Sequence, residues 1–331
     1  MEHTLRGYPQ IVAGNSRPTR LRHDDDGGRF ERLEDPAGGR VNKWMAGARP
    51  RTLPAAIVPV LVGTACAVGE TKLIWWRFAA AMVAALAIQI GTNFANDYSD
   101  GKRGTDDPSK RVGPVRLVGW GLASPGAVRR ASLLSFAVAG VAGLALAAAV
   151  DWKLLLVGAA SFAAGWLYTG GPRPYGYAGF GELFVFVFFG LVATVGSTYV
   201  QTGRITGLSI GAALPVGFLA TALLVVNNLR DIPGDTESNK RTLAVRIGDK
   251  RTRALYVALL VGAVVAVPLV SGLGQRPGGA LALIAIPLAQ RPVTAVLSNA
   301  RGPALIPVLV ATGRIQLAFG TLFALGLSLK T

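Results

Sequence analysis

The chain has 331 residues, of which 51% are hydrophobic and 16% charged, and its formal net charge is +16 at pH 7. About a quarter of the residues in a soluble domain are charged, so this composition favours an integral membrane protein. The only cysteine is Cys66 and the only histidines are His3 and His23, which argues against a disulfide framework, a Cys- or His-held metal and a Ser–His nucleophile. Any bound metal is therefore expected to have oxygen ligands, which favours Mg²⁺.

The N-terminal segment, residues 1–43, differs from the rest of the chain. It is rich in Arg, Asp and Gly and has little apolar periodicity, so we predict a disordered tail. It also lacks the apolar core of a signal peptide, and we do not expect it to be cleaved. Residues 44–331 are predicted to form one transmembrane domain.

Long apolar runs fill that domain. Runs of about 17–25 residues are long enough to cross a bilayer as helices. The sequence therefore predicts an all-α integral membrane protein with about nine transmembrane helices. The eighth run is the weakest, because Gln290, Arg291 and Pro292 interrupt it. The predicted spans are 52–69, 74–96, 131–150, 153–169, 183–201, 207–229, 253–272, 278–298 and 304–329.

The distribution of Lys and Arg predicts the orientation. With the N-terminus in the cytoplasm, the strongly basic connections 97–130 and 230–252 both lie on the cytoplasmic side, as the positive-inside rule requires. The opposite connections carry few basic residues, such as Lys72, Lys153 and Arg204. We therefore predict a multi-pass protein of the cell membrane. The excess positive charge fits this topology and an attraction to anionic lipid, and no motif supports a nucleic-acid partner.

An acidic motif follows the second predicted span. Asn93, Asp97 and Asp100 are spaced by four and three residues, so on a helix they share one face. Asp106 would reach the same place only from a loop. Ionisable groups at the end of a membrane span are costly unless they face a polar cavity, which makes them candidates for function.

A second acidic motif follows the sixth predicted span. Asn227, Asp231 and Asp235 are again spaced by four residues. Pro233 lies between the two acids, which a regular helix tolerates only where it ends or bends. Asn and Asp near helix ends also serve as caps, and this is the structural alternative for each residue taken singly.

Two such motifs on one face of the membrane predict a site for a diphosphate. Mg²⁺ is usually held by one or two carboxylates and completed by substrate phosphates. The predicted metal ligands are Asn93, Asp97, Asp100, Asp106, Asp231 and Asp235. Basic side chains close to the motifs could neutralise the remaining phosphate charge: Lys102, Arg111, Arg116, Lys240 and Arg241. A diphosphate bound at a bilayer implies a lipid tail, and hence ionisation of an allylic prenyl diphosphate.

Aromatic residues around the predicted cytoplasmic loop 170–182 could shield the resulting carbocation. Tyr168, Tyr175 and Tyr177 lie there, followed by several Phe residues of the fifth span, and aromatic faces attract cations. The alternative is that the Phe residues face lipid and the Tyr residues anchor the interface. The run Gly170–Tyr175 is interpreted as a lid that places Arg173 over the site.

The two acidic motifs resemble those of the UbiA superfamily of intramembrane aromatic prenyltransferases. The matching strings are Asn93-x-x-Asn96-Asp97-x-x-Asp100 with Asp106, and Asn227-Asn228-x-Arg230-Asp231-x-x-x-Asp235. Three stretches are similar to the members of the menaquinone pathway that act on 1,4-dihydroxy-2-naphthoate: 111–116, 228–231 and 240–248. The opening 44–52 is also similar, so the resemblance covers about 44–331. The Pro233-Gly234 pair departs from the pattern that the resemblance implies, and it bears on how far the Asp235 side chain reaches.

The resemblance implies a nine-span helical fold whose Mg²⁺ ions bind a polyprenyl diphosphate while an aromatic acid accepts the prenyl group with loss of its carboxylate. By position, Asp97, Asp100, Asp231 and Asp235 would be catalytic metal–diphosphate ligands. The implied substrate contacts are Asn93, Lys102, Arg111, Arg116, Tyr168, Arg173, Tyr175, Asn227, Lys240 and Arg241. Two alternatives stay open: the same fold acting on another aromatic acceptor, and a secondary transporter that uses intramembrane acids for ion coupling.

Overall fold

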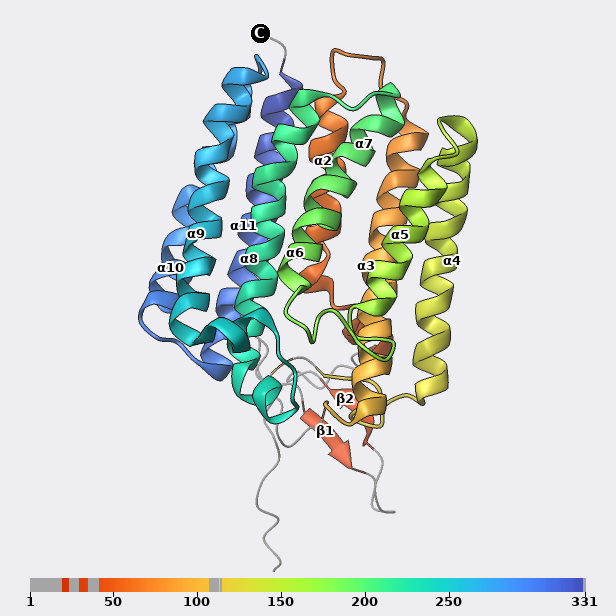
Figure 1. Ribbon diagram of the computed structural model, residues 1–331, viewed down its shortest axis with the longest axis vertical. Coiled ribbons are helices and arrows are strands. Elements are labelled where there is room, and N and C mark those ends of the chain that lie inside the picture. The colour runs from red at the N-terminus through yellow and green to blue at the C-terminus, as the bar shows by residue number, and fades with distance from the viewer. Residues whose placement is uncertain (1–19, 24–29, 35–41, 107–112, 114, 330–331) are drawn as a thin grey trace, which may run out of the picture.

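The computed structural model describes residues 20–23, 30–34, 42–106, 113 and 115–329. All the predicted spans correspond to apolar helices (Figure 1). Within the described residues, seven of these helices are long enough to cross a membrane, and Pro54–Cys66 and Leu154–Leu167 are shorter. The helical elements are α1 Lys43–Ala48, η1 Pro50–Thr52, α2 Pro54–Cys66, α3 Trp75–Arg103, α4 Pro125–Ala149, α5 Leu154–Leu167, α6 Gly181–Val185, η2 Phe186–Val192, α7 Ala193–Thr202, α8 Gly207–Glu237, α9 Leu243–Leu273, η3 Pro277–Ala289, α10 Gln290–Leu297, η4 Gly302–Ala304 and α11 Leu305–Ser328.

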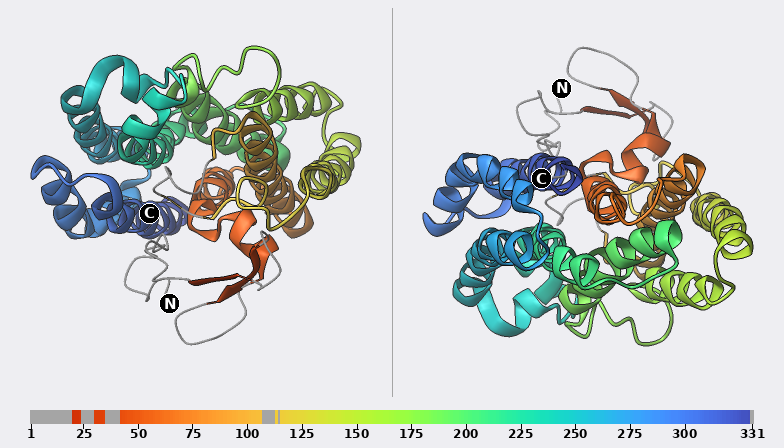
Figure 2. Two further views of the ribbon diagram at one scale, coloured as in Figure 1. Left: turned by 90° about the horizontal axis from the view of Figure 1, so that it is seen from below. Right: turned by 90° about the horizontal axis from the view of Figure 1, so that it is seen from above.

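The helices form two groups that meet along a central set. Figures 1 and 2 show α3, α4 and α5 on one side, α8 to α11 on the other, and α2 with α6 and α7 between them. Helix α8 is the most enclosed of the long helices, which fits its position against α9, α11 and η2. Small residues allow the closest approaches: the backbone of Gly190 in η2 packs directly against that of Gly217 in α8. Close contact at glycine is the usual way for helices to associate in lipid.

The acidic motifs lie at one end of the bundle. Both motif-bearing helices run past the predicted end of their span, α3 to Arg103 and α8 to Glu237. Helix α8 continues through Pro233 and ends four residues later, at Glu237. The proline has no N–H to bond the carbonyl of Leu229, so the helix loses one backbone bond close to its end. The eighth span changes its type of helix at residues 290–292, where the 3₁₀ helix η3 is followed by the α-helix α10.

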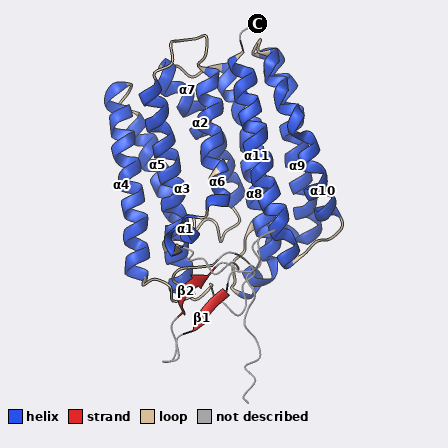
Figure 3. Ribbon diagram, turned by 180° about the vertical axis from the view of Figure 1, so that it is seen from behind, coloured by secondary structure: helices blue, strands red, loops and turns tan. Residues whose placement is uncertain are grey.

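At the opposite end of the bundle, a side chain of one helix bonds the backbone of two others. Arg77 at the start of α3 donates hydrogen bonds to the carbonyl oxygens of Ala149 (3.1 Å) and Val200 (3.0 Å), which lie at the ends of α4 and α7. The C-terminal end of α11 also lies there (Figures 1 and 3). The short strands β1 Arg20–His23 and β2 Phe30–Glu34 pair antiparallel near the end that carries the motifs. The prediction that residues 1–43 are a disordered tail stays a prediction.

Candidate active site

A cavity of about 570 Å³ opens between α2, α3, α5, α7 and α8. Its polar end lies where the two acidic motifs approach each other. From there it extends between apolar residues toward the opposite end of the bundle, reaching Ala81, Gly143 and Val200. The cavity thus joins a charged end to a long apolar extension. Its polar lining residues include Asn93, Asn96, Asp100, Arg116, Asn227, Arg230, Asp231, Asp235 and Lys240.

Asp100 is held by groups from two loops that lie far apart in sequence. One carboxylate oxygen accepts a hydrogen bond from the Tyr177 hydroxyl (2.7 Å), and the other pairs with the Lys240 ammonium (3.1 Å). That ammonium also lies 4.8 Å from the centroid of the Tyr177 ring. Burial and the negative charge of Asp100 raise the pKa of the Tyr177 hydroxyl, so it remains protonated and donates to the carboxylate.

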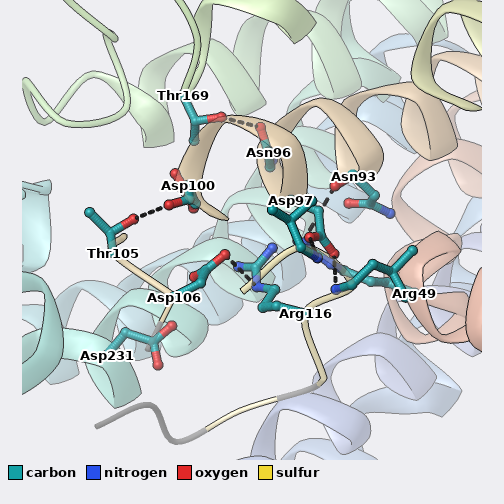
Figure 4. A network of polar contacts seen from close by, with 12 residues as sticks. Arg49, Asn93, Asn96, Asp97, Asp100, Thr105, Asp106, Arg116, Thr169 and Asp231 are labelled. Atoms are coloured by element: carbon teal, nitrogen blue, oxygen red, sulfur yellow. Dashed lines mark hydrogen bonds and ion pairs between the residues drawn. The ribbon is translucent and has the colours of Figure 1, made fainter. Parts of the chain in front are cut away.

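Asp97 has a different environment, although it belongs to the same motif. Its side chain is fully buried, and its two oxygens accept hydrogen bonds from the backbone N–H groups of Leu117 (2.9 Å) and Val118 (3.0 Å). Figure 4 shows Arg49 beside it. Asp97 does not line the cavity. It anchors the segment that follows the first motif, and its predicted role as a metal ligand stays a prediction.

The two asparagines of the first motif stabilise the cavity wall. Asn93 donates to the backbone carbonyl of Ala48 (2.9 Å), which joins α3 to α1. Asn96 accepts a hydrogen bond from the Thr169 hydroxyl (2.9 Å), shown in Figure 4, which joins α3 to the loop after α5. Both residues line the cavity.

The second motif presents its acids from α8. Both carboxylate oxygens of Asp231 accept hydrogen bonds from the guanidinium group of Arg230, at 2.8 and 2.7 Å. The same guanidinium donates to the side-chain oxygen of Asn227 (3.0 Å). Asp235 accepts a long hydrogen bond from the Thr242 hydroxyl (3.4 Å). Despite Pro233, Asp235 lines the same cavity as Asp100 and Asp231.

The segment after the first motif brings a further ion pair. Arg116 and Asp106 are both buried, with 3.5 Å between Nε and a carboxylate oxygen. Figure 4 shows the two side chains next to each other. Arg116 lines the cavity and Asp106 does not. The predicted metal-ligand role of Asp106 stays a prediction.

Other predicted substrate contacts lie away from the cavity. Lys102 is exposed, with its ammonium 6.0 Å from the Tyr98 ring centroid. Arg173 and Arg241 are exposed, and neither lines the cavity. The loop 168–180 therefore presents tyrosines to the cavity, where the sequence suggested Arg173. Arg111 lies outside the described residues.

Aromatic rings form a continuous row along the cavity wall. The centroid distances are 5.5 Å for Tyr168–Tyr175, 4.0 Å for the stacked Tyr175–Phe184 pair and 6.0 Å for Phe184–Phe188. All four residues line the cavity. Phe180 is exposed, and Phe186 packs against Phe218 at 5.4 Å. The row crosses the junction with the π-helix η2, a type of helix often found at functional sites.

Sequence reasoning missed two arginines that line the cavity, Arg49 and Arg230. Arg49 has a left-handed backbone conformation (φ 52°) between α1 and η1, and its guanidinium donates to the Asn93 carbonyl oxygen (3.4 Å). Arg230 belongs to the second motif and to the basic connection 230–252, but its type and position alone assign it no role at the site. Both arginines lie in stretches that resemble the family, 44–52 and 228–231, and this resemblance was the signal that could have identified them.

The donor chemistry of the cavity fits Mg²⁺ shared with a substrate. Asp100, Asp231 and Asp235 supply carboxylate oxygens, and amide oxygens lie nearby. Among the residues that the structure describes, no three His, Cys, Asp or Glu side chains converge on one point. Mg²⁺ needs only one or two carboxylates when phosphate oxygens and waters complete its shell, so these residues fit the ion.

Comparison with known proteins relates the chain to enzymes. Residues 56–296 match the model of the UbiA prenyltransferase family. The 1,4-dihydroxy-2-naphthoate octaprenyltransferase of Mycobacterium tuberculosis is 50% identical over 277 residues, covering 84% of this chain and 94% of that protein. The enzyme of the same name from Escherichia coli is 36% identical, with 88% of this chain and 96% of that protein covered.

Solved structures show the same fold at low sequence identity. A UbiA homolog from Aeropyrum pernix K1 superposes with a TM-score of 0.61 at 16% identity, covering 86% of this chain and 98% of that one. A UbiA homolog from Archaeoglobus fulgidus bound to DMAPP and Mg²⁺ gives a TM-score of 0.55 at 15% identity, covering 83% and 99%.

Proposed function

The chain belongs to the UbiA prenyltransferase family, and we propose that it transfers a polyprenyl group from a polyprenyl diphosphate to 1,4-dihydroxy-2-naphthoate. The products would be demethylmenaquinol, which is the reduced form of demethylmenaquinone, CO₂ and diphosphate. Relatives named for this acceptor support the proposal at up to 50% identity over most of both chains. The observation that carries it is the cavity itself, because one space joins the acids and bases of the motifs to an apolar extension.

The cavity suits the two halves of the donor. The apolar extension along α3, α5 and α7 would hold the prenyl tail, and the polar end would hold the diphosphate. Lys240, Arg116 and Arg230 lie there to offset the charge that develops on the leaving diphosphate. Bound Mg²⁺ would supply further positive charge at the same oxygens. The acids Asp100, Asp231 and Asp235 are the residues proposed to hold it.

The chemistry requires a site that excludes water. When the allylic C–O bond breaks, its electron pair leaves with the diphosphate and the prenyl carbon becomes electron-deficient. The faces of Tyr168, Tyr175 and Phe184 would stabilise this carbon until the aromatic ring attacks it. A new C–C bond forms at the ring, and loss of CO₂ returns the electron pair of the carboxylate bond to the ring. The apolar lining protects the cationic carbon from hydrolysis.

The test uses membranes that contain the protein. In the presence of Mg²⁺, we expect polyprenyl diphosphate and 1,4-dihydroxy-2-naphthoate to give a prenylated quinol and CO₂. In excess EDTA we expect neither product. Asp231→Asn should lower kcat by roughly 100-fold or more, the scale of losing one charge-stabilising group in an active site. Exposed Glu70, at the opposite end of the bundle, offers the control Glu70→Gln, which should leave kcat unchanged.

A panel of acceptors tests the alternatives in the same membranes. Conversion of 4-hydroxybenzoate or homogentisate, with the naphthoate untouched, would keep the family chemistry and reject the proposed acceptor. Full activity of Asp231→Asn would reject the proposed diphosphate site.

A further inference from the structure

A buried carboxylate outside both motifs lies beside the cavity. Glu182, in the first turn of α6, is only 6% exposed. One of its oxygens accepts a hydrogen bond from the side-chain amide of Asn228 (2.9 Å). The other oxygen, Oε2, is buried and has no hydrogen-bond partner within the described part of the chain. Buried polar atoms are rarely left without a partner, so an atom of this kind marks a place where a ligand can complete the bonding.

Glu182 is not itself one of the residues that line the cavity, but its neighbours connect it to the cavity. Asn228, its partner, lines the cavity, as do Phe184 and Val185 on the next turn of the chain. Tyr168 also lines it and lies over the start of α6, since a Cβ added at Gly181 would be 3.5 Å from the Tyr168 hydroxyl oxygen. Glu182, Asn228 and Tyr168 therefore form one polar corner, separate from the ion pairs of the motifs.

The charge of this corner limits which part of the substrates it can bind. A carboxylate repels the diphosphate and the acceptor's own carboxylate, and it makes no favourable contact with a prenyl tail. A ring hydroxyl of the acceptor is the remaining group, and it is a hydrogen-bond donor. We propose that Glu182 binds a ring hydroxyl of the aromatic acceptor through Oε2 and thereby determines acceptor specificity. This inference rests on the proposed function.

Such a contact would also assist the reaction. A hydroxyl that donates to a carboxylate releases electron density into its ring, and the ring carbon becomes a better nucleophile toward the prenyl cation. Asn228 holds the other oxygen of Glu182 and so fixes the direction of the carboxylate. The bond would be charge-assisted, and bonds of this kind are stronger than those between neutral groups.

The inference is tested with Glu182→Gln in membranes, with each substrate varied in turn. Glutamine can keep the bond from Asn228 through its amide oxygen, but it places an NH₂ group where Oε2 was, so the ring hydroxyl loses its charged acceptor and can only accept a weaker, neutral bond there. We expect KM for the dihydroxynaphthoate to rise about 10- to 100-fold, the scale of losing a hydrogen bond to a charged group. KM for the prenyl diphosphate should stay within about twofold, which a general loss of structure would not allow. Glu182→Asp should recover part of the loss, and Glu70→Gln should show none.

Acceptors with a single hydroxyl give an independent test on the unchanged protein. 1-Hydroxy-2-naphthoate and 4-hydroxy-2-naphthoate each lack one of the two ring hydroxyls. The compound that lacks the hydroxyl bound by Glu182 should have a raised KM with wild-type protein. Glu182→Gln should not raise the KM for this compound any further. Equal KM values for all three acceptors with wild-type protein would overturn the inference, even if the Glu182 variants fail to fold. An unchanged acceptor KM in Glu182→Gln would overturn it while leaving the proposed function intact. Failure of wild-type protein to convert the dihydroxynaphthoate would reject the proposed function and the inference with it.

Discussion

Within the first motif, adjacent turns of one helix give two carboxylates different partners. The Asp100 carboxylate bonds two side-chain groups, the Tyr177 hydroxyl and the Lys240 ammonium. Side chains can move, so the carboxylate can exchange these partners for a bound ligand. Asp97 meets two backbone N–H groups, at Leu117 and Val118, whose positions are set by the chain itself. Because buried charge is costly, each carboxylate must keep its partners or gain equivalent ones. Asp97 is therefore suited to hold structure and Asp100 to take part in binding.

Asp97→Asn should destabilise the protein. An asparagine offers one acceptor oxygen, and its NH₂ group would face a backbone N–H, so one buried donor loses its partner. The expected loss is about 2 kcal/mol in the free energy of unfolding. The single thiol, Cys66, is fully buried and provides the measurement, because a thiol-reactive fluorophore labels it only when the bundle opens. We expect labelling to begin at a lower temperature in Asp97→Asn than in wild-type protein.

Asp151→Asn is the matched control for this variant. Asp151 lies in the connection between α4 and α5 at the opposite end of the bundle, where hydrogen bonds from Tyr199 and the Lys153 backbone lower the pKa of its carboxyl. Its exchange should leave the labelling temperature of Cys66 nearly unchanged. If Asp97→Asn unfolds like wild-type protein and loses only activity, Asp97 acts as a ligand and the anchoring role is rejected.

Spacing along a helix predicted part of the site. The spacing of Asn227, Asp231 and Asp235 on α8, and of Asn93 and Asp100 on α3, brought these residues to one cavity as expected. The partners of Asp97 could not be predicted, because they are backbone groups 20 and 21 residues away in a segment without periodicity. Glu182 gave no signal either, since a single acid at a helix start is indistinguishable from a capping residue in the sequence.

At the scale of elements, hydropathy located the spans but did not predict their local geometry. The predicted run 183–201 became α6, η2 and α7 in succession, with a π-helix at Phe186–Val192. A change of helical winding leaves no mark in an apolar composition, because each type of helix satisfies the backbone. The limits of α3 and α8 were also underestimated, since polar residues continue these helices beyond the apolar run.

The contact between η2 and α8 gives a prediction at this scale. A Cβ at Gly190 would lie 2.6 Å from the Cα of Gly217, so Gly190→Ala must push the two helices apart. We expect a loss of about 1–3 kcal/mol in the free energy of unfolding, the usual cost of overpacking a core. The labelling temperature of Cys66 measures it.

Gly272→Ala is the control for Gly190→Ala. A Cβ at Gly272, near the end of α9, meets no other atom within 4 Å. The same methyl group there should leave the labelling temperature unchanged or raise it slightly, because alanine favours a helix over glycine. Equal effects of the two substitutions would show that the contact between Gly190 and Gly217 does not limit stability.

For the whole molecule, the two ends of the bundle differ in charge and in aromatic residues. The end with the motifs carries exposed basic residues such as Lys102, Arg173 and Arg241. At the other end, Trp75, Trp76 and Trp152 are exposed, as tryptophans at a membrane interface often are. The positive-inside rule then favours a cytoplasmic position for the cavity's polar end, where a charged diphosphate would be available.

This orientation is tested with one introduced cysteine at each end. Glu237 ends α8 beside the second motif, Glu70 lies in the connection after α2, and both are exposed. Cys66 can remain, because its burial protects it from the reagent. In right-side-out vesicles a membrane-impermeant thiol reagent should label Glu70→Cys and leave Glu237→Cys unlabelled, and inside-out vesicles should reverse the pattern. The opposite result would place the polar end of the cavity outside the cell. The basic connections would then lie on the outer side, against the positive-inside rule. The prenyl diphosphate would also have to be supplied from outside the cell.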